Sequence, residues 1–313
     1  MKMLITGATG YIGSMLARYI INTYEDIELA ALVRNADKAR RMLPFSVRLI
    51  RADITDDSAM ADVSESFDYL VHTAAQTRSH EMKAHPAETA AGIVNGTENV
   101  LHLAERCGVK SMVYLSSMEV YGDIDCSDGH RVSEAEQGYI DPLEARSCYP
   151  MGKRMAENIC FDHFAEYGMP VRIARLAQTF GSGVASDETR VFAQFVSAAR
   201  EGRDIVLHTA GDTMGNYCDI HDTLRAIMLI LQKGRAGEAY NIVNEENTMT
   251  VRQMAELVAR DVANGGIGVK YDIPADNIYG YAARTGIRLS AGKLMNLGWK
   301  PQKSLAEMYR DML

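Results

Sequence analysis

Residues 3–20 read MLITGATGYIGSMLARYI, and this stretch decides the fold. The apolar run from Met3 to Ile5 predicts a short buried strand, and apolar residues at helical spacing after the glycines predict a helix. Between them stand Gly7, Gly10 and Gly13, with the spacing G-x-x-G-x-x-G. Such glycines allow a tight turn, a close approach of the backbone to a pyrophosphate, and close packing of the helix on its sheet. Because a strand precedes them and a helix follows, they indicate dinucleotide binding rather than an ordinary glycine-rich turn.

Strand-like and helix-like segments alternate over the first half of the chain. Further strands are predicted at residues 27–33, 47–50, 69–72, 112–115 and 171–174, and helices at 36–43, 87–107 and 150–167. This alternation implies right-handed crossovers and a parallel sheet that is covered on both faces. The predicted fold class is therefore α/β, a Rossmann-like doubly wound parallel sheet.

The pattern becomes less regular after Gln178. Helices are predicted at residues 190–200, 222–232 and 250–262, and strands at 205–208 and 239–243. We interpret this half as a smaller C-terminal substrate lobe that is interleaved in sequence with the sheet. The dinucleotide-binding domain then comprises residues 1–177 and about 215–245, and the substrate-binding lobe comprises about 178–214 and 246–313.

Composition narrows the possible partners and the location. The chain has 313 residues and a formal net charge of −8, which gives no basic footprint for nucleic acid. We expect no membrane segment, because its apolar runs are too short to span a bilayer. Its five cysteines are scattered and odd in number, and the run Met1 to Ile5 leads straight into the glycines without a secretory leader. A cytoplasmic protein is expected.

The residue that chooses between NAD and NADP should lie at the end of the second strand. Arg34 stands there, where NAD-binding proteins usually carry a carboxylate, and Lys38, Arg40 and Arg41 follow. A solvated basic helix face explains the run equally well, so Arg34 favours NADP without deciding it. Asp53, after the third strand, should meet the adenine. The expected cofactor-binding residues are Gly7, Thr9, Gly10, Tyr11, Ile12, Gly13, Arg34, Asp53, Ile54, Ala74, Ala75, Tyr149 and Lys153.

Tyr149 and Lys153 lie four residues apart at the start of a predicted helix, so both project from one face. An ammonium near a phenol can lower the pKa of the phenol from about 10 towards neutrality. Tyr149 would then be a general base that takes a proton from a sugar hydroxyl while hydride leaves for a nicotinamide. Ser117, at the end of the fifth strand, could hydrogen-bond the same oxygen. An ordinary amphipathic helix surface could show the Tyr/Lys spacing alone, but not the three features together.

These motifs resemble the extended short-chain dehydrogenase/reductase family, the nucleotide-sugar epimerases and dehydratases. The resemblance runs over nearly the whole chain; the matching stretches are the glycine loop, Asp53, HTAAQ at 72–76, NGT at 95–97, Ser117, Tyr149-x-x-x-Lys153 and LGWKP at 297–301. It implies NAD or NADP as cofactor, a nucleotide-sugar substrate and a homodimer. It also implies that Gln178 and Thr179 border the sugar nucleotide. The expected substrate-binding residues are Gln76, Ser117, Met118, Gln178, Thr179 and Arg288.

Glu119 could be a second acid/base, because family members that eliminate water or carbon dioxide carry Ser/Thr-x-Glu-Val-Tyr-Gly at this place. Oxidation of the sugar at C4 acidifies the C5 proton, which a carboxylate two residues past Ser117 could remove. Alternatively, Glu119 pairs with a nearby cation or faces solvent. Met118 stands where one dehydratase branch carries an acidic residue, and the stretch RSCYPMGKR at 146–154 resembles UDP-glucuronate decarboxylases. Epimerisation, dehydration and decarboxylation all remain open.

Gly215 departs from the family pattern, since an arginine that contacts nucleotide phosphate is expected there. Either Arg175, Arg190 or Arg288 takes its place, or the substrate is not a typical nucleotide diphosphate sugar. No metal site is expected, because the histidines and cysteines show no ligand spacing.

The leading hypothesis is an enzyme that oxidises a nucleotide-linked sugar, transforms the keto intermediate and returns the hydride. An NADP-dependent keto reductase of the same fold is the alternative, and a non-enzymatic nucleotide sensor is a third hypothesis.

Overall fold

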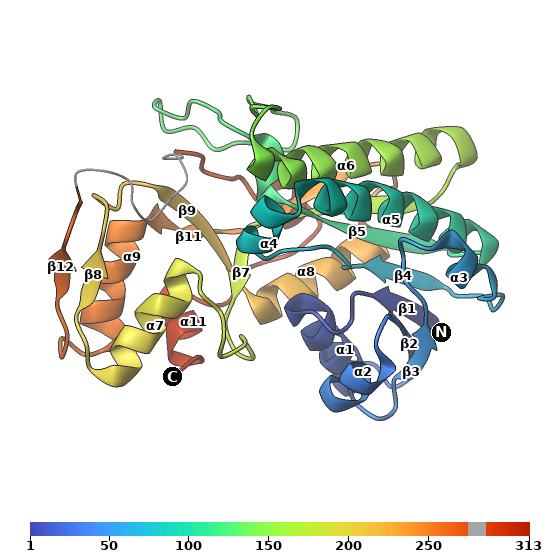
Figure 1. Ribbon diagram of the computed structural model, residues 1–313, viewed down its shortest axis with the longest axis horizontal. Coiled ribbons are helices and arrows are strands. Elements are labelled where there is room, and N and C mark those ends of the chain that lie inside the picture. Colours follow the sequence, from blue (N-terminus) through green and yellow to red (C-terminus); the bar gives the residue numbers. More distant parts are fainter. Residues whose placement is uncertain (275–285) are drawn as a thin grey trace.

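A seven-stranded parallel sheet forms the larger part of the molecule (Figure 1). The structure is a computed structural model that describes residues 1–274 and 286–313. The strand order is β10-β6-β5-β4-β1-β2-β3. The strands are β1 (Lys2–Thr6), β2 (Glu28–Val33), β3 (Arg48–Arg51), β4 (Tyr69–His72), β5 (Ser111–Ser117), β6 (Val171–Leu176) and β10 (Ala239–Ile242). The strand order reverses between β1 and β4, and ligands of doubly wound sheets bind at such a switch point.

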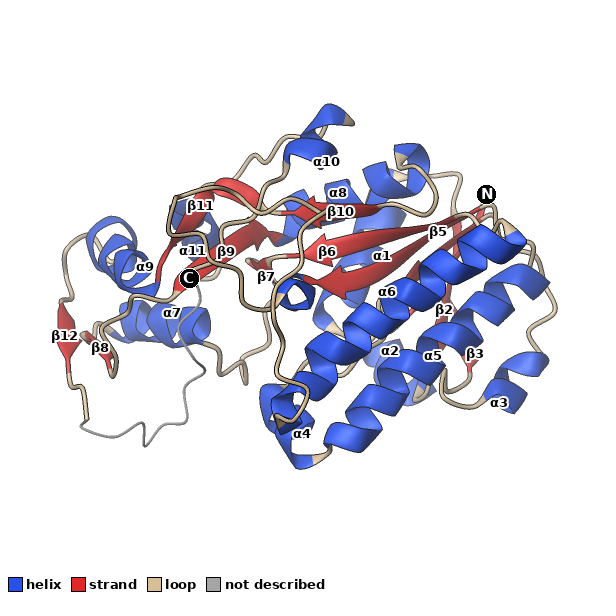
Figure 2. Ribbon diagram, turned by 90° about the horizontal axis from the view of Figure 1, so that it is seen from above, coloured by secondary structure: helices blue, strands red, loops and turns tan. Residues whose placement is uncertain are grey.

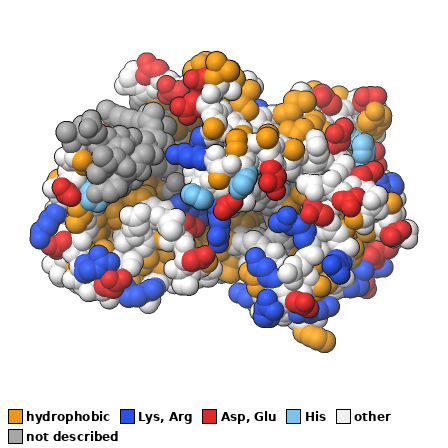
Figure 3. Space-filling view, viewed as in Figure 1, with side chains coloured by type: hydrophobic (Ala, Val, Ile, Leu, Met, Phe, Trp, Pro, Cys, Tyr) orange, Lys and Arg blue, Asp and Glu red, His pale blue; other side chains and the backbone are white. Residues whose placement is uncertain are grey.

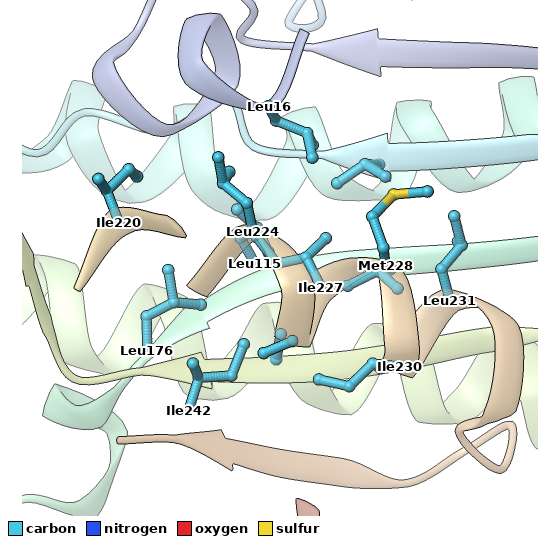
Figure 4. Packing of buried hydrophobic residues seen from close by; sticks show 14 of the residues in the cluster. Leu16, Leu115, Leu176, Ile220, Leu224, Ile227, Met228, Ile230, Leu231 and Ile242 are labelled. Atoms are coloured by element: carbon cyan, nitrogen blue, oxygen red, sulfur yellow. The ribbon is translucent and has the colours of Figure 1, made fainter. Parts of the chain in front are cut away.

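Helices cover both faces of this sheet. They are α1 (Tyr11–Thr23), α2 (Ala36–Met42), α3 (Asp57–Ala61), α4 (Ser79–Ala84), α5 (Pro86–Arg106), α6 (Cys148–Tyr167) and α8 (Ile220–Lys233). Figure 2 shows α5 and α6 side by side over one face. On the other face, Leu224 and Ile227 of α8 pack among Leu16, Leu115 and Leu176 (Figure 4). The predicted doubly wound parallel sheet is confirmed.

The smaller part lies beyond the carboxyl ends of β5 and β6, at the left of Figure 1. Its strands are β7 (Gln178–Phe180), β9 (Met214–Asp219) and β11 (Asn244–Thr250) in one sheet, and β8 (Ile205–Leu207) with β12 (Val269–Tyr271) in another. Its helices are α7 (Val191–Glu201), α9 (Val251–Leu257) with the π-helical turn Val258–Val262, and α11 (Leu305–Arg310). The stacked rings of Phe180 and Phe192, 4.3 Å apart, lie in its core.

The chain passes between the two parts more than once. It leaves the large sheet after β6, returns with α8 and β10, and leaves again with β11. The short helix α10 (Gly292–Asn296) contacts β10. β9 belongs to the smaller sheet, although all its residues after Met214 fall in the range of about 215–245 that was predicted to belong with the large one. The functional division into a cofactor domain and a substrate lobe stays a prediction.

Candidate active site

The glycine loop lies against the end of β4. Gly7 has a φ of +71°, and a Cβ there would lie 2.6 Å from the backbone nitrogen of Ala74. A Cβ on Gly13 would collide with the carbonyl oxygen of Gly7. Gly10 caps α1 without any side-chain hydrogen bond, so the first N–H groups of the helix face the loop. The structure therefore brings together the predicted loop and the predicted Ala74–Ala75 segment, and it explains why the loop needs small residues.

Three predicted cofactor residues, Arg34, Asp53 and Ile54, follow the ends of β2 and β3. Arg34 follows β2 with a side chain that is 80% exposed, and its only ion pair among the described residues is with Asp53, at 3.8 Å. The side chain of Ile54 packs over Gly96 of α5. The Tyr11 hydroxyl donates a 3.0 Å hydrogen bond to the carbonyl of Ser182, which links the glycine loop to the segment after β7. Thr9 and Ile12 are at most partly buried beside it.

Tyr149 and Lys153 are both buried at the start of α6, beneath the end of β5. The Lys153 ammonium donates a 2.6 Å hydrogen bond to the Leu115 carbonyl and lies 6.0 Å from the centre of the Tyr149 ring. The Ser117 hydroxyl lies near the Tyr149 phenol, whose pKa it lowers, and it accepts a 3.2 Å hydrogen bond from the backbone N–H of Glu119. The geometry thus places a phenol, a hydroxyl and an ammonium at the carboxyl end of β5.

The pKa of Tyr149 shifts in the direction opposite to the one expected. Burial, with the nearby Glu119 carboxylate, raises it to about 12, and Ser117, Arg146 and Arg190 counteract part of this rise. Burial also lowers the pKa of Lys153 to about 8. Desolvation of the phenol outweighs the nearby cations, so the pKa of Tyr149 is not lowered overall; the stabilising effect of Lys153 on the phenolate stays a prediction.

Arg146, which was not among the predicted site residues, joins two of the candidate catalytic groups. Its Nη2 lies 2.9 Å from Glu119 Oε1, and its guanidinium lies 5.2 Å from the centre of the Tyr149 ring. Its Nε donates a 3.4 Å bond to the Ser79 hydroxyl. Its Nη1 is buried and has no partner among the described residues. Glu119 does pair with a cation, as the alternative interpretation held, yet it also borders Tyr149.

The predicted substrate residues have different surroundings. Gln178 lies on β7, and its side-chain oxygen is buried and unpartnered among the described residues, so it could accept a ligand hydrogen bond. The Thr179 hydroxyl already bonds the Ala177 carbonyl. Gln76 accepts bonds from the N–H groups of residues 77 and 78 before α4. Met118 lies in the turn after β5 and packs against the core.

The structure explains the glycine at position 215. A Cβ there would collide with the hydroxyl of Tyr217, which lies on the same face of β9. Arg175 cannot replace the expected arginine, because its guanidinium is buried in an ion pair with Glu157 at 2.7 Å. Arg190 pairs with Glu188 and is 45% exposed. Arg288 is half-buried and makes no side-chain hydrogen bond or ion pair with another described residue.

The described residues offer neither a cluster of metal-ligating side chains nor a membrane-spanning helix. No group of three or more His, Cys, Asp or Glu side chains there could hold a metal ion. No helix in residues 1–274 or 286–313 is both long and apolar enough to cross a membrane. Figure 3 shows Lys and Arg side chains interspersed with Asp and Glu over the visible face.

Comparison with known proteins settles the family. The sequence profile of the NAD dependent epimerase/dehydratase family matches residues 3–243. The chain belongs to this family. The predicted family, fold class and class of enzyme are thereby confirmed, and the chain is an NAD(P)-dependent enzyme of the nucleotide-sugar epimerase/dehydratase type. Its relatives include UDP-glucuronic acid decarboxylase 6 of Arabidopsis thaliana, 28% identical over 98% of this chain and 86% of that protein.

Solved structures show the same fold. UDP-glucose 4-epimerase of Thermotoga maritima with UDP-glucose has a TM-score of 0.84 and 23% identity, over 99% of this chain and 96% of that one. dTDP-glucose 4,6-dehydratase of Bacillus anthracis in complex with NAD has a TM-score of 0.80 and 21% identity, over 99% and 94%. RMD of Pseudomonas aeruginosa with NADPH has a TM-score of 0.78 and 23% identity, over 99% and 97%. Solved structures of this fold therefore contain NAD in one case and NADPH in another.

The residues at the switch point fit such a dinucleotide. The positive φ of Gly7 and the uncapped start of α1 leave backbone N–H groups free for a pyrophosphate. Lys153 and Tyr149, at the start of α6, lie beside the carboxyl end of β5, where the ribose and nicotinamide would be held.

Proposed function

We propose that this enzyme decarboxylates a nucleotide-linked uronic acid, with UDP-glucuronate as the substrate to test first. The observation that carries the proposal is Arg146, whose guanidinium touches Glu119 and the Tyr149 ring and keeps one buried nitrogen unpartnered. A substrate carboxylate would satisfy that donor, whereas a neutral sugar would leave it buried without a charged partner. The likeness to UDP-glucuronic acid decarboxylases over 98% of the chain supports the same substrate.

The proposed reaction begins at the C4 hydroxyl of the sugar. The bound nicotinamide supplies a hydride acceptor and returns the hydride at the end of the cycle. Tyr149 removes the hydroxyl proton, and Ser117 holds the same oxygen by a hydrogen bond. The ammonium of Lys153, buried beneath them, stabilises the phenolate form of Tyr149 that accepts this proton.

Oxidation at C4 makes the uronate a β-keto acid, and its C5–C6 bond then breaks with release of carbon dioxide. The electron pair moves into the C4 carbonyl, whose oxygen is held by Ser117 and the neutral phenol of Tyr149. Glu119, fixed by Arg146, lies at the same end of the site and is the group proposed to deliver the C5 proton. Return of the hydride gives a nucleotide-linked pentose.

The experiment is a product assay with UDP-glucuronate, UDP-glucose and dTDP-glucose, followed by NMR. UDP-glucuronate should yield carbon dioxide and a UDP-pentose. Arg146→Met should weaken UDP-glucuronate binding about 10- to 100-fold, the size of one charged hydrogen bond, and leave UDP-glucose inhibition unchanged. Epimerisation of UDP-glucose without turnover of UDP-glucuronate, or an unchanged preference in Arg146→Met, would overturn the proposal.

We also propose NADP as the cofactor. Support comes from the exposed guanidinium of Arg34 at the end of β2, because an arginine there accommodates a 2′-phosphate. Calorimetry should show tighter binding of NADP than of NAD, and Arg34→Ser should remove the difference; equal affinities in the wild type would contradict it. Stoichiometric release of oxidised NADP in each turnover would instead favour a keto reductase.

A cytoplasmic homodimer remains the proposed state of the protein. All five cysteines are unpaired, as a reducing compartment would keep them. The α6 residues Met151, Met155 and Phe161 are 40–48% exposed and could pack against a second copy. Analytical ultracentrifugation would test the dimer, and a monomer at all concentrations would exclude it.

A further inference from the structure

A buried carboxylate lies one helical turn beyond Lys153 on α6. Glu157 is only 7% exposed. Its Oε1 accepts a 2.5 Å hydrogen bond from the Ser116 hydroxyl and a 3.0 Å bond from Arg175 Nε, and its Oε2 accepts a 2.7 Å bond from Arg175 Nη2. Ser116 is the residue before Ser117 on β5. Glu157 thus contacts the strand end that carries one candidate catalytic group, from the helix that carries two others.

Arg175 extends these contacts to the segment that follows β5. Its Nη1 donates to the Tyr121 hydroxyl at 3.1 Å and to the Glu134 carbonyl at 3.0 Å. The Tyr121 hydroxyl in turn donates a 2.6 Å bond to Asn241 on β10. One connected set of hydrogen bonds therefore joins α6, β5, β6, β10 and the loop after Gly122.

Stability alone does not explain a charged pair at this place. Taking two charges out of water costs about as much as their attraction returns, and apolar residues of the same volume often stabilise a core as well or better. A structural role would be equally served by apolar packing. What apolar residues cannot supply is a hydrogen bond to Ser116 and a negative charge near Lys153.

We propose that Glu157 is a positioning residue for the reaction: it fixes Ser116, and through it Ser117, and it is the counter-charge of the Lys153 ammonium. This inference rests on the catalytic roles proposed above for Ser117 and Lys153. Arg175 fixes the Glu157 carboxylate with two of its nitrogens, so that the carboxylate can serve both Ser116 and Lys153.

The groups around Lys153 support the counter-charge role. From β4 comes His72, whose pKa burial lowers to about 3, so it is neutral. From β5 comes the Tyr114 ring, 4.6 Å from the ammonium. On α6 itself, burial raises the pKa of the Cys160 thiol, which is also neutral, and the Tyr149 phenol is protonated. Burial lowers the pKa of Lys153, and Glu157 acts against this by raising it.

The test compares three variants. Glu157→Gln keeps an acceptor for Ser116 but removes the charge and leaves Arg175 unpaired. Glu157→Gln combined with Arg175→Met removes both charges, so that no buried ion is left alone. Glu105→Gln is the control, because Glu105 pairs with His163 across α5 and α6 and does not contact Lys153. The readouts are the NMR titration of ¹³C-lysine, assigned with Lys153→Arg, and kcat and KM as functions of pH.

The Lys153 midpoint should move to lower pH in both Glu157 variants, and the alkaline limb of kcat should move with it. We expect kcat to fall about 10- to 100-fold, the range for small misplacements of reacting groups, with KM within about threefold. Glu105→Gln should match the wild type in all three quantities. A folded double variant with the wild-type midpoint and kcat would show that the pair is structural only and overturn the proposal.

The lysine titration needs no substrate, so it distinguishes this proposal from the proposed function. If UDP-glucuronate is not turned over by the wild type, the decarboxylase assignment fails, while the midpoint still decides the role of Glu157. If the double variant does not fold, the midpoint of Glu157→Gln decides it.

Discussion

Two glycines of the loop, Gly10 and Gly13, should respond differently to alanine. Gly10 has a φ of −84° and a ψ of 171°, which alanine adopts readily, and the atom nearest to its added Cβ is the Gly7 oxygen at 3.3 Å. Gly10→Ala should therefore change the free energy of unfolding of the cofactor-free protein by less than about 0.5 kcal/mol. The new methyl group lies where the backbone must approach the pyrophosphate, so the Kd for NADPH should rise at least about tenfold, or about 1.4 kcal/mol.

Gly13→Ala, unlike Gly10→Ala, should clearly lower the free energy of unfolding. Its Cβ would lie 2.9 Å from Ala8 Cα and collide with the Gly7 oxygen, and these backbone atoms cannot move aside as a flexible side chain can. Overpacking of this kind costs about 1–3 kcal/mol. Gly92→Ala is the matched control, because nothing lies within 4 Å of its Cβ and alanine in a helix gains about 0.5–1 kcal/mol over glycine.

Urea unfolding followed by circular dichroism gives the stabilities, and titration calorimetry with NADPH gives the affinities. The order of stability should be Gly92→Ala, then wild type and Gly10→Ala together, then Gly13→Ala. If Gly10→Ala binds NADPH as tightly as the wild type, the pyrophosphate does not pass this loop. If Gly13→Ala is as stable as Gly92→Ala, close backbone packing does not explain the glycine.

Three further expectations concern the reacting groups and the core. Tyr149→Phe should lower kcat about 10²- to 10⁴-fold and leave NADPH affinity within about twofold; near-wild-type turnover would exclude Tyr149 as the base. Burial lowers the pKa of His72 in the folded protein to about 3. The free energy of unfolding should therefore fall by up to about 4 kcal/mol as the pH drops from 6.5 towards 3, because only the unfolded state takes up the proton in this range. His72→Gln should flatten the dependence of this free energy on pH, measured by urea unfolding, and parallel curves for the variant and the wild type would contradict this. Gly215→Arg should lower the melting temperature, because a Cβ there would collide with the hydroxyl and the ring carbons of Tyr217; an unchanged melting temperature would contradict this.

The sheet and the glycine loop could be predicted because their signals are local. Continuous apolar runs, helical periodicity and glycine spacing each lie within about 20 residues of sequence. The three-stranded sheet of the smaller part could not be predicted in the same way, because β11 and β9 pair with an irregular register. The helix expected over residues 250–262 changes to a π-helical turn at Val258, which periodicity does not reveal.

For the site, sequence spacing predicted which side chains lie together better than it predicted their burial and their pKa values. The i, i+4 spacing of Tyr149 and Lys153 placed both on one face of α6, but it could not show that burial would raise the pKa of the phenol. Arg146 and Glu157 owe their importance to partners 27 and 41 residues away, Glu119 and Ser116. Of these two residues, only Arg146 lies in a stretch whose sequence resembles UDP-glucuronate decarboxylases. That resemblance could not show which side chains Arg146 contacts.

The return of the chain to the large sheet limits how this enzyme can be divided. A fragment that ended at Ala177 would contain every predicted cofactor-binding residue, yet it would lack α8 and β10. β6 would become an unprotected edge, and the apolar face that α8 covers, including Leu115 and Leu176, would be bare. The predicted cofactor half is thus not a module that can be cut out or exchanged between enzymes.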